Sequence, residues 1–294
     1  MMEGTVKIDR FRLKANASFA IREGWLTKGL RHVAEDPEVF LDETAAMGKL
    51  GVGSAMVKSI RYWMQAAGLT TEKKSGRRTQ TLTELGQAIL NNDRYFEDDF
   101  TLCLIHCNLV SDPAMATVWY LLFNCYQPTR FTREDMTETL LQTFRELTEK
   151  DFAVSSFRDD CATVLKTYVS DDVRQLSPED NMQCPLAALN LFTKTTRNIY
   201  ECTMPPPSKL HALAVLYVML RQMQGRESIS LDRLISEPCG VGKVFHLTPY
   251  RINAYLDELQ AAGYLRIQRT AGLNMIYPSP GLTPMGIVQE YYRK

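Results

Sequence analysis

The chain has 294 residues, of which 45% are hydrophobic, and its 34 Lys and Arg residues balance its 34 Asp and Glu residues. This length and composition predict a globular protein of about two domains. The zero net charge excludes a general attraction to nucleic acid or to an acidic membrane surface, so binding to either must come from local charge asymmetry.

Targeting signals are missing from the sequence. No apolar run reaches the roughly 18 residues that span a bilayer, and the first ten residues, MMEGTVKIDR, lack the apolar core of a signal peptide. We therefore expect a cytoplasmic protein without membrane contact. In that compartment the seven Cys residues should be thiols. The sequence contains no CxxC pair, which would have suggested a metal or redox motif.

The stretch 50–90 is the most informative part of the chain. Ser54 is a favourable N-cap for a helix, and Gly68 is placed to end that helix in a left-handed conformation. Apolar residues recur within it at helical spacing. These residues are Val57, Ile60 and Met64. The pattern predicts an amphipathic helix that buries one face.

Two short β segments, 69–71 and 79–82, should follow this helix and be joined by a charged turn. Thr83 is the expected N-cap of another helix. The resulting order is helix, turn, helix, two-stranded wing, helix. This order is typical of a winged helix-turn-helix unit.

Residues 94–200 have helical patterns throughout, and we expect no strand there longer than a few residues. One helix is predicted over 131–147 with Thr132 as its N-cap, and another over 155–169. Three consecutive prolines at 205–207 form a stiff segment and are the best candidate for a linker.

The order of the first unit returns near the C-terminus. The sequence QAAGL at 65–69 matches QAAGY at 260–264, and the Leu-Thr pair at 82–83 matches that at 282–283. The spacing predicts a second winged unit whose wing is five residues longer. The chain should thus be mainly α, with winged helix-turn-helix units near both ends. The expected domains are 1–93, a helical middle domain at 94–204, and 205–294.

Positive charge is concentrated in the first unit. The segment Lys58–Arg78 holds six cationic residues and one acidic residue, a net charge of +5. Such a density of positive charge suits neutralisation of DNA phosphates. Arg61 would then lie in the DNA groove, and the wing would contact the DNA backbone. The alternative is a solvated face on a protein-binding winged helix. The residues expected to contact DNA are Ser54, Lys58, Ser59, Arg61, Lys73, Lys74, Arg77 and Arg78.

The second unit is closer to neutral. Its expected second helix, 248–262, carries Arg251 and Asn253 but also Asp257 and Glu258. Its wing adds two arginines. They are Arg266 and Arg269. DNA contact and pairing with another protein, including a second copy of this chain, therefore both remain open for this unit.

No pattern supports an enzyme, a metal site or a cofactor. Cys103, His106 and Cys107 share one helix face, but no second cluster supplies the further ligands that zinc needs, so we expect a buried core cluster. The sequence CGVGKV at 239–244 lacks phosphate-loop spacing and should form a turn before a strand-like 244–246. Two acidic pairs are expected on solvated surface. They are Asp159-Asp160 and Asp171-Asp172.

Several segments together resemble the bacterial domain-of-unknown-function family 4007. They are FAIREGWLTKGL (19–30), LGVGSAMVKSIRYWMQAAGL (50–69), FRDDCATVLKTY (157–168), EDNMQCPLAALNLF (179–192) and GVGKVFHL (240–247). The resemblance implies a place in phage-defence islands, beside sulfurtransferase-like proteins of DNA phosphorothioation systems. It assigns no reaction. Ser54-Ala55 stands where the family pattern has a Lys-Asn-like pair, which removes a positive charge from the start of the recognition helix.

We therefore expect a non-catalytic DNA-binding subunit of a phage-defence or DNA-modification complex. It would position partner enzymes, such as sulfurtransferase-like proteins, on double-stranded DNA. Two alternatives stay open: a transcriptional regulator that binds an operator as a homodimer, and an assembly adaptor whose winged helices bind protein.

Overall fold

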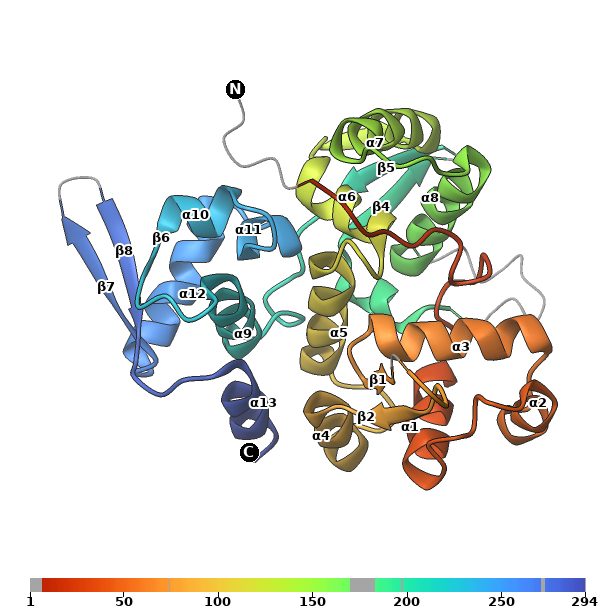
Figure 1. Ribbon diagram of the computed structural model, residues 1–294. Helices are drawn as coiled ribbons and strands as arrows, with labels where there is room; N and C mark the ends of the chain where they lie inside the picture. Colours follow the sequence, from red (N-terminus) through yellow and green to blue (C-terminus); the bar gives the residue numbers. More distant parts are fainter. Residues whose placement is uncertain (1–6, 74, 170–182, 197, 271–272, 294) are drawn as a thin grey trace.

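The computed structural model describes residues 7–73, 75–169, 183–196, 198–270 and 273–293 (Figure 1). The described chain is mainly helical, as predicted, and carries three small antiparallel sheets. Among the described residues, none of the helices has the length and apolar character required to span a membrane.

The N-terminal part folds in the predicted order of helices and strands. Its elements are α1 (Trp25–Glu35), α2 (Glu43–Leu50), α3 (Ser54–Ala66), β1 (Thr70–Glu72), β2 (Gln80–Leu82) and α4 (Glu84–Asn92). The strands pair antiparallel, with Thr70 opposite Leu82. Thr83 is the N-cap of α4, as predicted, and accepts a hydrogen bond from the amide of Gly86. The assignment of Ser54 as N-cap was wrong, because Gly53 takes that position and Ser54 is the first helical residue.

The middle part contains a sheet, so the expectation of helices throughout 94–200 was wrong. The sheet is antiparallel in the order β3-β5-β4. Thr132 is confirmed as the N-cap of α7. The elements are α5 (Asp99–Ser111), α6 (Thr117–Cys125), β3 (Arg130–Thr132), α7 (Arg133–Leu147), α8 (Val154–Tyr168), η2 (Pro185–Leu189), β4 (Phe192–Thr196) and β5 (Ile199–Cys202). The β4 and β5 sequences are rich in β-branched and aromatic residues, which favour strands.

The C-terminal part has its own three-stranded sheet in the order β6-β8-β7. Its elements are α9 (Ala212–Met223), β6 (Ile229–Ser230), α10 (Leu231–Ser236), α11 (Val241–Val244), α12 (Pro249–Ala261), β7 (Leu265–Thr270), β8 (Leu273–Pro278) and α13 (Pro284–Tyr292). The predicted strand-like 244–246 was wrong, because Gly240 caps the short helix α11 and Val244 ends it. The hairpin of β7 and β8 projects at the left of Figure 1.

The two QAAG segments are equivalent in three dimensions as well as in sequence. Both end a helix with a glycine in the left-handed region, Gly68 with φ of 73° and Gly263 with φ of 81°. Thr283 caps α13 through the amide of Gly286, as Thr83 caps α4. The second hairpin has six-residue strands where the first has three-residue strands, so the second hairpin is the longer one, as expected from the spacing.

The middle and C-terminal parts share one order of elements. In each, a helix leads to a short strand, further helices and then a hairpin, and the second hairpin strand lies between the other two strands. The N-terminal part has the same order without a first strand. There the carbonyl of Pro37, between α1 and α2, accepts a hydrogen bond from the amide of Gln80 in β2 at 3.0 Å.

All three parts are joined by one hydrophobic core that extends from Ile8 to Val288. The side chains of Trp63 in α3 and Trp119 in α6 meet edge to face with ring centroids 5.3 Å apart. At the C-terminus, Tyr291 donates a hydrogen bond to Asp98, just before α5. The boundaries at 93 and 204 stay predictions, and the triple proline follows β5 and precedes α9.

Candidate nucleic-acid interface

Helix α3 is buried over more of its surface than its apolar stripe predicted. Ile60 and Trp63 are fully buried, and the Trp63 indole donates to the Phe19 carbonyl at 3.0 Å. Tyr62, which is not part of that stripe, is also buried and donates to the Met115 carbonyl at 2.8 Å. The helix therefore packs against the middle part as well as its own unit, and only a narrow face is left for a partner.

Ser59 lies inside this packed region, so its assignment as a DNA contact was wrong. Its exposed fraction is 0%, and its hydroxyl has no hydrogen-bond partner among the described residues. Ser54 and Lys58 remain at the helix surface, where both contact the Glu43 carboxylate of α2. The Lys58 ammonium lies 3.1 Å from that carboxylate, and the Ser54 hydroxyl donates to it.

Arg61 holds the first hairpin strand against α3. Its guanidinium lies 2.7 Å from the carboxylate of Glu72 in β1, and Glu72 has only 8% of its side chain exposed. The same guanidinium donates to the carbonyl of Arg78 at 3.3 Å. Reading a base would require these partners to be released, so Arg61 is better described as a structural residue of this unit.

The hairpin tip keeps its exposed cations. Arg77 pairs with Glu38 at 2.9 Å and Arg78 pairs with Glu72 at 2.7 Å, while their side chains stay 77% and 68% exposed. The exposed Arg77–Glu38 pair contributes little free energy and can be exchanged for another anion, whereas Arg78 pairs with a carboxylate that is largely buried. Lys73 is exposed beside them, and Lys74 lies outside the described residues.

The surface of the C-terminal unit is different in character. Tyr250, at the start of α12, is 80% exposed. Arg269 pairs with Asp257 at 2.6 Å, and the Arg266 guanidinium lies 4.7 Å from the ring centroid of Tyr277. This surface therefore has the near-neutral charge balance expected from the sequence. DNA and another protein both remain open as its partner.

The predicted core cluster in α5 is confirmed. His106 is fully buried between the Tyr168 hydroxyl at 2.8 Å and the Val244 carbonyl at 2.6 Å, and burial lowers its pKa to about 3. Burial also raises the pKa of the Cys103 thiol above its usual range. A neutral imidazole and a protonated thiol are expected of core residues. Among the described residues, no three His, Cys, Asp or Glu side chains are grouped to hold a metal ion.

Asp160 is not on solvated surface, so that prediction was wrong for this residue. Its exposed fraction is 2%, and its carboxylate accepts hydrogen bonds from the Lys14 amide at 2.8 Å and the Asn16 side chain at 2.7 Å. Asp159 stays at the surface and pairs with the Lys14 ammonium at 2.7 Å. The pair Asp171-Asp172 lies outside the described residues.

The Asp160 environment predicts a measurable pH dependence. Burial raises the pKa of Asp160 from 3.8 to about 6. Between these values the folded protein binds more protons than the unfolded chain, so this residue's contribution to stability falls as pH rises, by up to about 3 kcal/mol. Urea unfolding should show that Asp160→Asn lowers the free energy of unfolding more at pH 4.5 than at pH 7. The reverse trend would mean that the two hydrogen bonds dominate and hold the pKa down.

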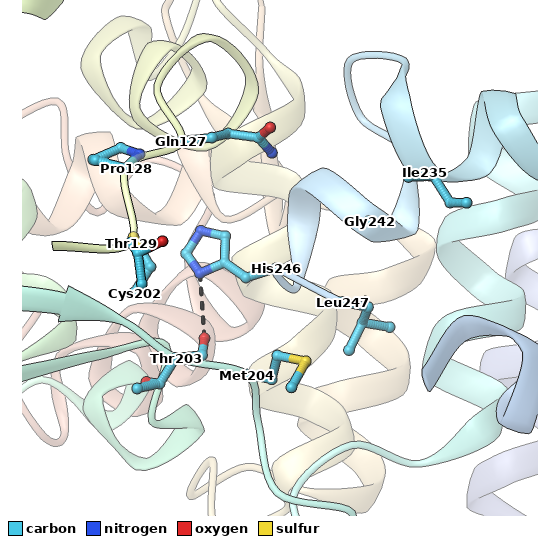
Figure 2. Close-up of a pocket in the computed structure, with 10 residues that line it drawn as sticks. All are labelled: Gln127, Pro128, Thr129, Cys202, Thr203, Met204, Ile235, Gly242, His246 and Leu247. Carbon is cyan, nitrogen blue, oxygen red and sulfur yellow. Dashed lines mark hydrogen bonds between the residues drawn. The ribbon is translucent and has the colours of Figure 1, made fainter. Parts of the chain in front are cut away.

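A small pocket of about 290 Å³ lies between the end of β5 and the segment after α11 (Figure 2). His246 points toward Thr203, whose carbonyl is 3.3 Å from its Nδ1. Burial lowers the pKa of His246 to about 4 and raises the pKa of Cys202 to about 12. The imidazole is then neutral and the thiol protonated at neutral pH, so this pair does not form an activated nucleophile.

Comparisons with known proteins give one family and two closely similar folds. A crystal structure of SspB matches with a TM-score of 0.86 and 28% identity over 98% of this chain and 89% of that chain. A magnesium ion-bound crystal structure of SspB matches with a TM-score of 0.84 and 28% identity over 96% and 88%. No curated protein matches significantly. Residues 15–292 match the model of a family of proteins of unknown function, and this chain therefore belongs to the DUF4007 family.

Proposed function

We propose that this protein binds double-stranded DNA through winged helix-turn-helix units and positions partner enzymes on it, as a non-catalytic cytoplasmic subunit of a defence or DNA-modification complex. One observation carries the proposal. Helices followed by a hairpin occur in all three parts of the chain, and in the N-terminal and C-terminal parts the hairpin follows directly after a helix, α3 and α12. In those two parts this order supports a wing beside a recognition helix, the arrangement that DNA-binding winged helices use.

The charge distribution supports the N-terminal unit as the part that contacts phosphates. Lys73, Arg77 and Arg78 are exposed on its hairpin, and Lys58 is exposed on α3. Contacts of this kind fix a protein on duplex DNA without reading sequence. The proposal therefore assigns this surface to the DNA backbone and leaves sequence preference to other parts of the complex.

The biological context of the proposal comes from the similar structures. The similar structures are of SspB and match nearly all of this chain at 28% identity, and the family resemblance implies the setting of a DNA phosphorothioation system. On this basis the partners would be sulfurtransferase-like or other proteins of such a system. A regulator of a defence island and a protein-binding adaptor are the competing functions.

The test is fluorescence anisotropy of the purified protein with a labelled duplex over a salt series. We expect binding at 50 mM salt that weakens steeply by 200 mM, because phosphate neutralisation releases counterions. A complex with no salt dependence would contradict a phosphate-contacting surface. A palindromic footprint upstream of the protein's own gene would favour the regulator, and protein co-purification without DNA affinity would favour the adaptor.

Metal-dependent DNA cleavage is the second candidate and would replace the non-catalytic role; one similar structure is magnesium ion-bound, which is a property of that protein. The discriminating assay incubates supercoiled plasmid with the protein and Mg²⁺. On the first proposal the plasmid stays supercoiled. Nicking that is lost in the surface variant Asp159→Asn would establish the second candidate and show that the protein is catalytic.

A further inference from the structure

A cleft of about 610 Å³ lies where the ends of α5 and α9 meet α10, and none of its lining residues belongs to the first hairpin. Its charged lining consists of three arginines and one glutamate. They are Arg221, Arg226, Arg233 and Glu237. A cleft of this volume is in the range that holds a small-molecule ligand, and its excess of positive charge favours an anion.

Arg221 is held in place by neutral groups. Its guanidinium donates to the side-chain oxygen of Asn108, contacts the Cys107 sulfur at 3.5 Å, and lies 5.6 Å from the Tyr217 ring centroid. Asn108 in turn donates to the Ala67 carbonyl at the end of α3. The direction of this cation is thus fixed by two other elements. A partly buried cation held only by neutral groups is stabilised by an anionic ligand.

The two other arginines complete the positive wall. Arg226 is exposed, and within the described part of the chain no carboxylate forms an ion pair with it or with Arg221. Arg233 pairs with Glu237 at 2.5 Å. Its backbone carbonyl accepts a hydrogen bond from the Gln222 side chain at 2.8 Å, which sets the distance between α10 and α9. One carboxylate therefore faces three guanidinium groups.

The remaining walls are less polar. Pro113, Tyr120 and Pro238 line the cleft together with the Ser111 side chain. Flat apolar surfaces beside a cationic wall suit a ligand that carries both a phosphate and an aromatic base, because the base can pack against them while guanidinium groups bind the phosphate oxygens.

We propose that this cleft binds the phosphate group of a nucleotide, supplied either by a free mononucleotide or by the phosphorylated end of a DNA strand. The site is independent of the proposed duplex-binding surface, which uses cations of the first hairpin. Arg221 and Arg226 bind the phosphate, and Arg233 contributes by sharing its guanidinium between Glu237 and the ligand.

The experiment is isothermal titration of the full chain with dAMP, with deoxyadenosine and with an unlabelled single strand carrying a 5′-phosphate. We expect dAMP or the phosphorylated strand to bind and deoxyadenosine not to bind. Binding of dAMP identifies the free nucleotide as the source. Binding of only the phosphorylated strand, and not of the same strand without its phosphate, identifies the strand end.

Arg226→Gln and Arg221→Gln should each raise the dissociation constant by about tenfold, the loss of one charge-assisted contact. Arg226 is exposed, so its variant keeps the fold even if the Arg221 variant does not. The exposed Arg145 of α7 is the matched control, and Arg145→Gln should bind as the wild type does. No binding of any phosphate compound would overturn the proposal and show that the carbonyl ends of α5 and α9 already offset these charges. Equal binding by all variants would also overturn it.

Discussion

Replacement of both Arg77 and Arg78 by Ala is expected to weaken duplex binding by roughly 100-fold or more at low salt. Each residue would lose one charge-assisted phosphate contact of about 1.5–3 kcal/mol. The slope of log affinity against log salt should fall by about 1 per lost contact, and the loss should be the same for every duplex sequence. Fluorescence anisotropy of a labelled duplex over a salt series measures both quantities.

The control for this double variant must remove the same charge elsewhere. Arg94 and Arg145 are exposed and lie outside the first hairpin, so their double Ala variant serves this purpose. Loss of Arg77 breaks an exposed ion pair with Glu38, and after loss of Arg78 the largely buried Glu72 carboxylate keeps its pair with Arg61, so the fold should hold. An unchanged salt slope would exclude the hairpin as a phosphate contact and favour the adaptor function.

The first unit could be predicted from its sequence because its signals are local. The glycine that ends α3, the threonine that caps α4 and the short strands between them each depend on a few adjacent residues. The same signals recur two hundred residues later, and there they also gave a correct order of helix, longer hairpin and helix.

The middle sheet was missed because its strands lack an alternating pattern. In β4 only Phe192 is buried and the four residues after it are exposed, so the period-two signal of a half-buried strand is absent. The three residues of β3 lead directly into α7 and share its N-cap, Thr132, so they could not be separated from that helix by pattern. The sheet forms because β5, which follows β4 in a hairpin, also pairs with the distant β3.

The candidate interface was predicted less well than the fold. The net charge of +5 over Lys58–Arg78 counts neighbours in sequence, whereas Glu38 and Glu43 reach the same surface from outside that segment. The burial of Ser59 likewise depends on the tertiary packing of α3, whose main contacts are with α1 and α2. The charge and burial of an interface depend on tertiary structure. The composition of a segment gives the charges it contributes, but not which other charges lie beside them or which side chains are exposed.

Truncation of Ile60 to Ala is expected to lower the free energy of unfolding by about 2–5 kcal/mol. Ile60 is fully buried in α3, and close packing leaves its neighbours little freedom to fill the space of the lost side-chain carbons. Lys58→Ala is the control on the same helix, because it removes only an exposed ion pair with Glu43 and should change stability by less than about 1 kcal/mol. Urea denaturation followed by circular dichroism gives both values. A loss below about 1 kcal/mol for Ile60→Ala would mean that the space can collapse around Ala. In that case α3 would be less tightly held than its contacts with Phe19 and Met115 indicate.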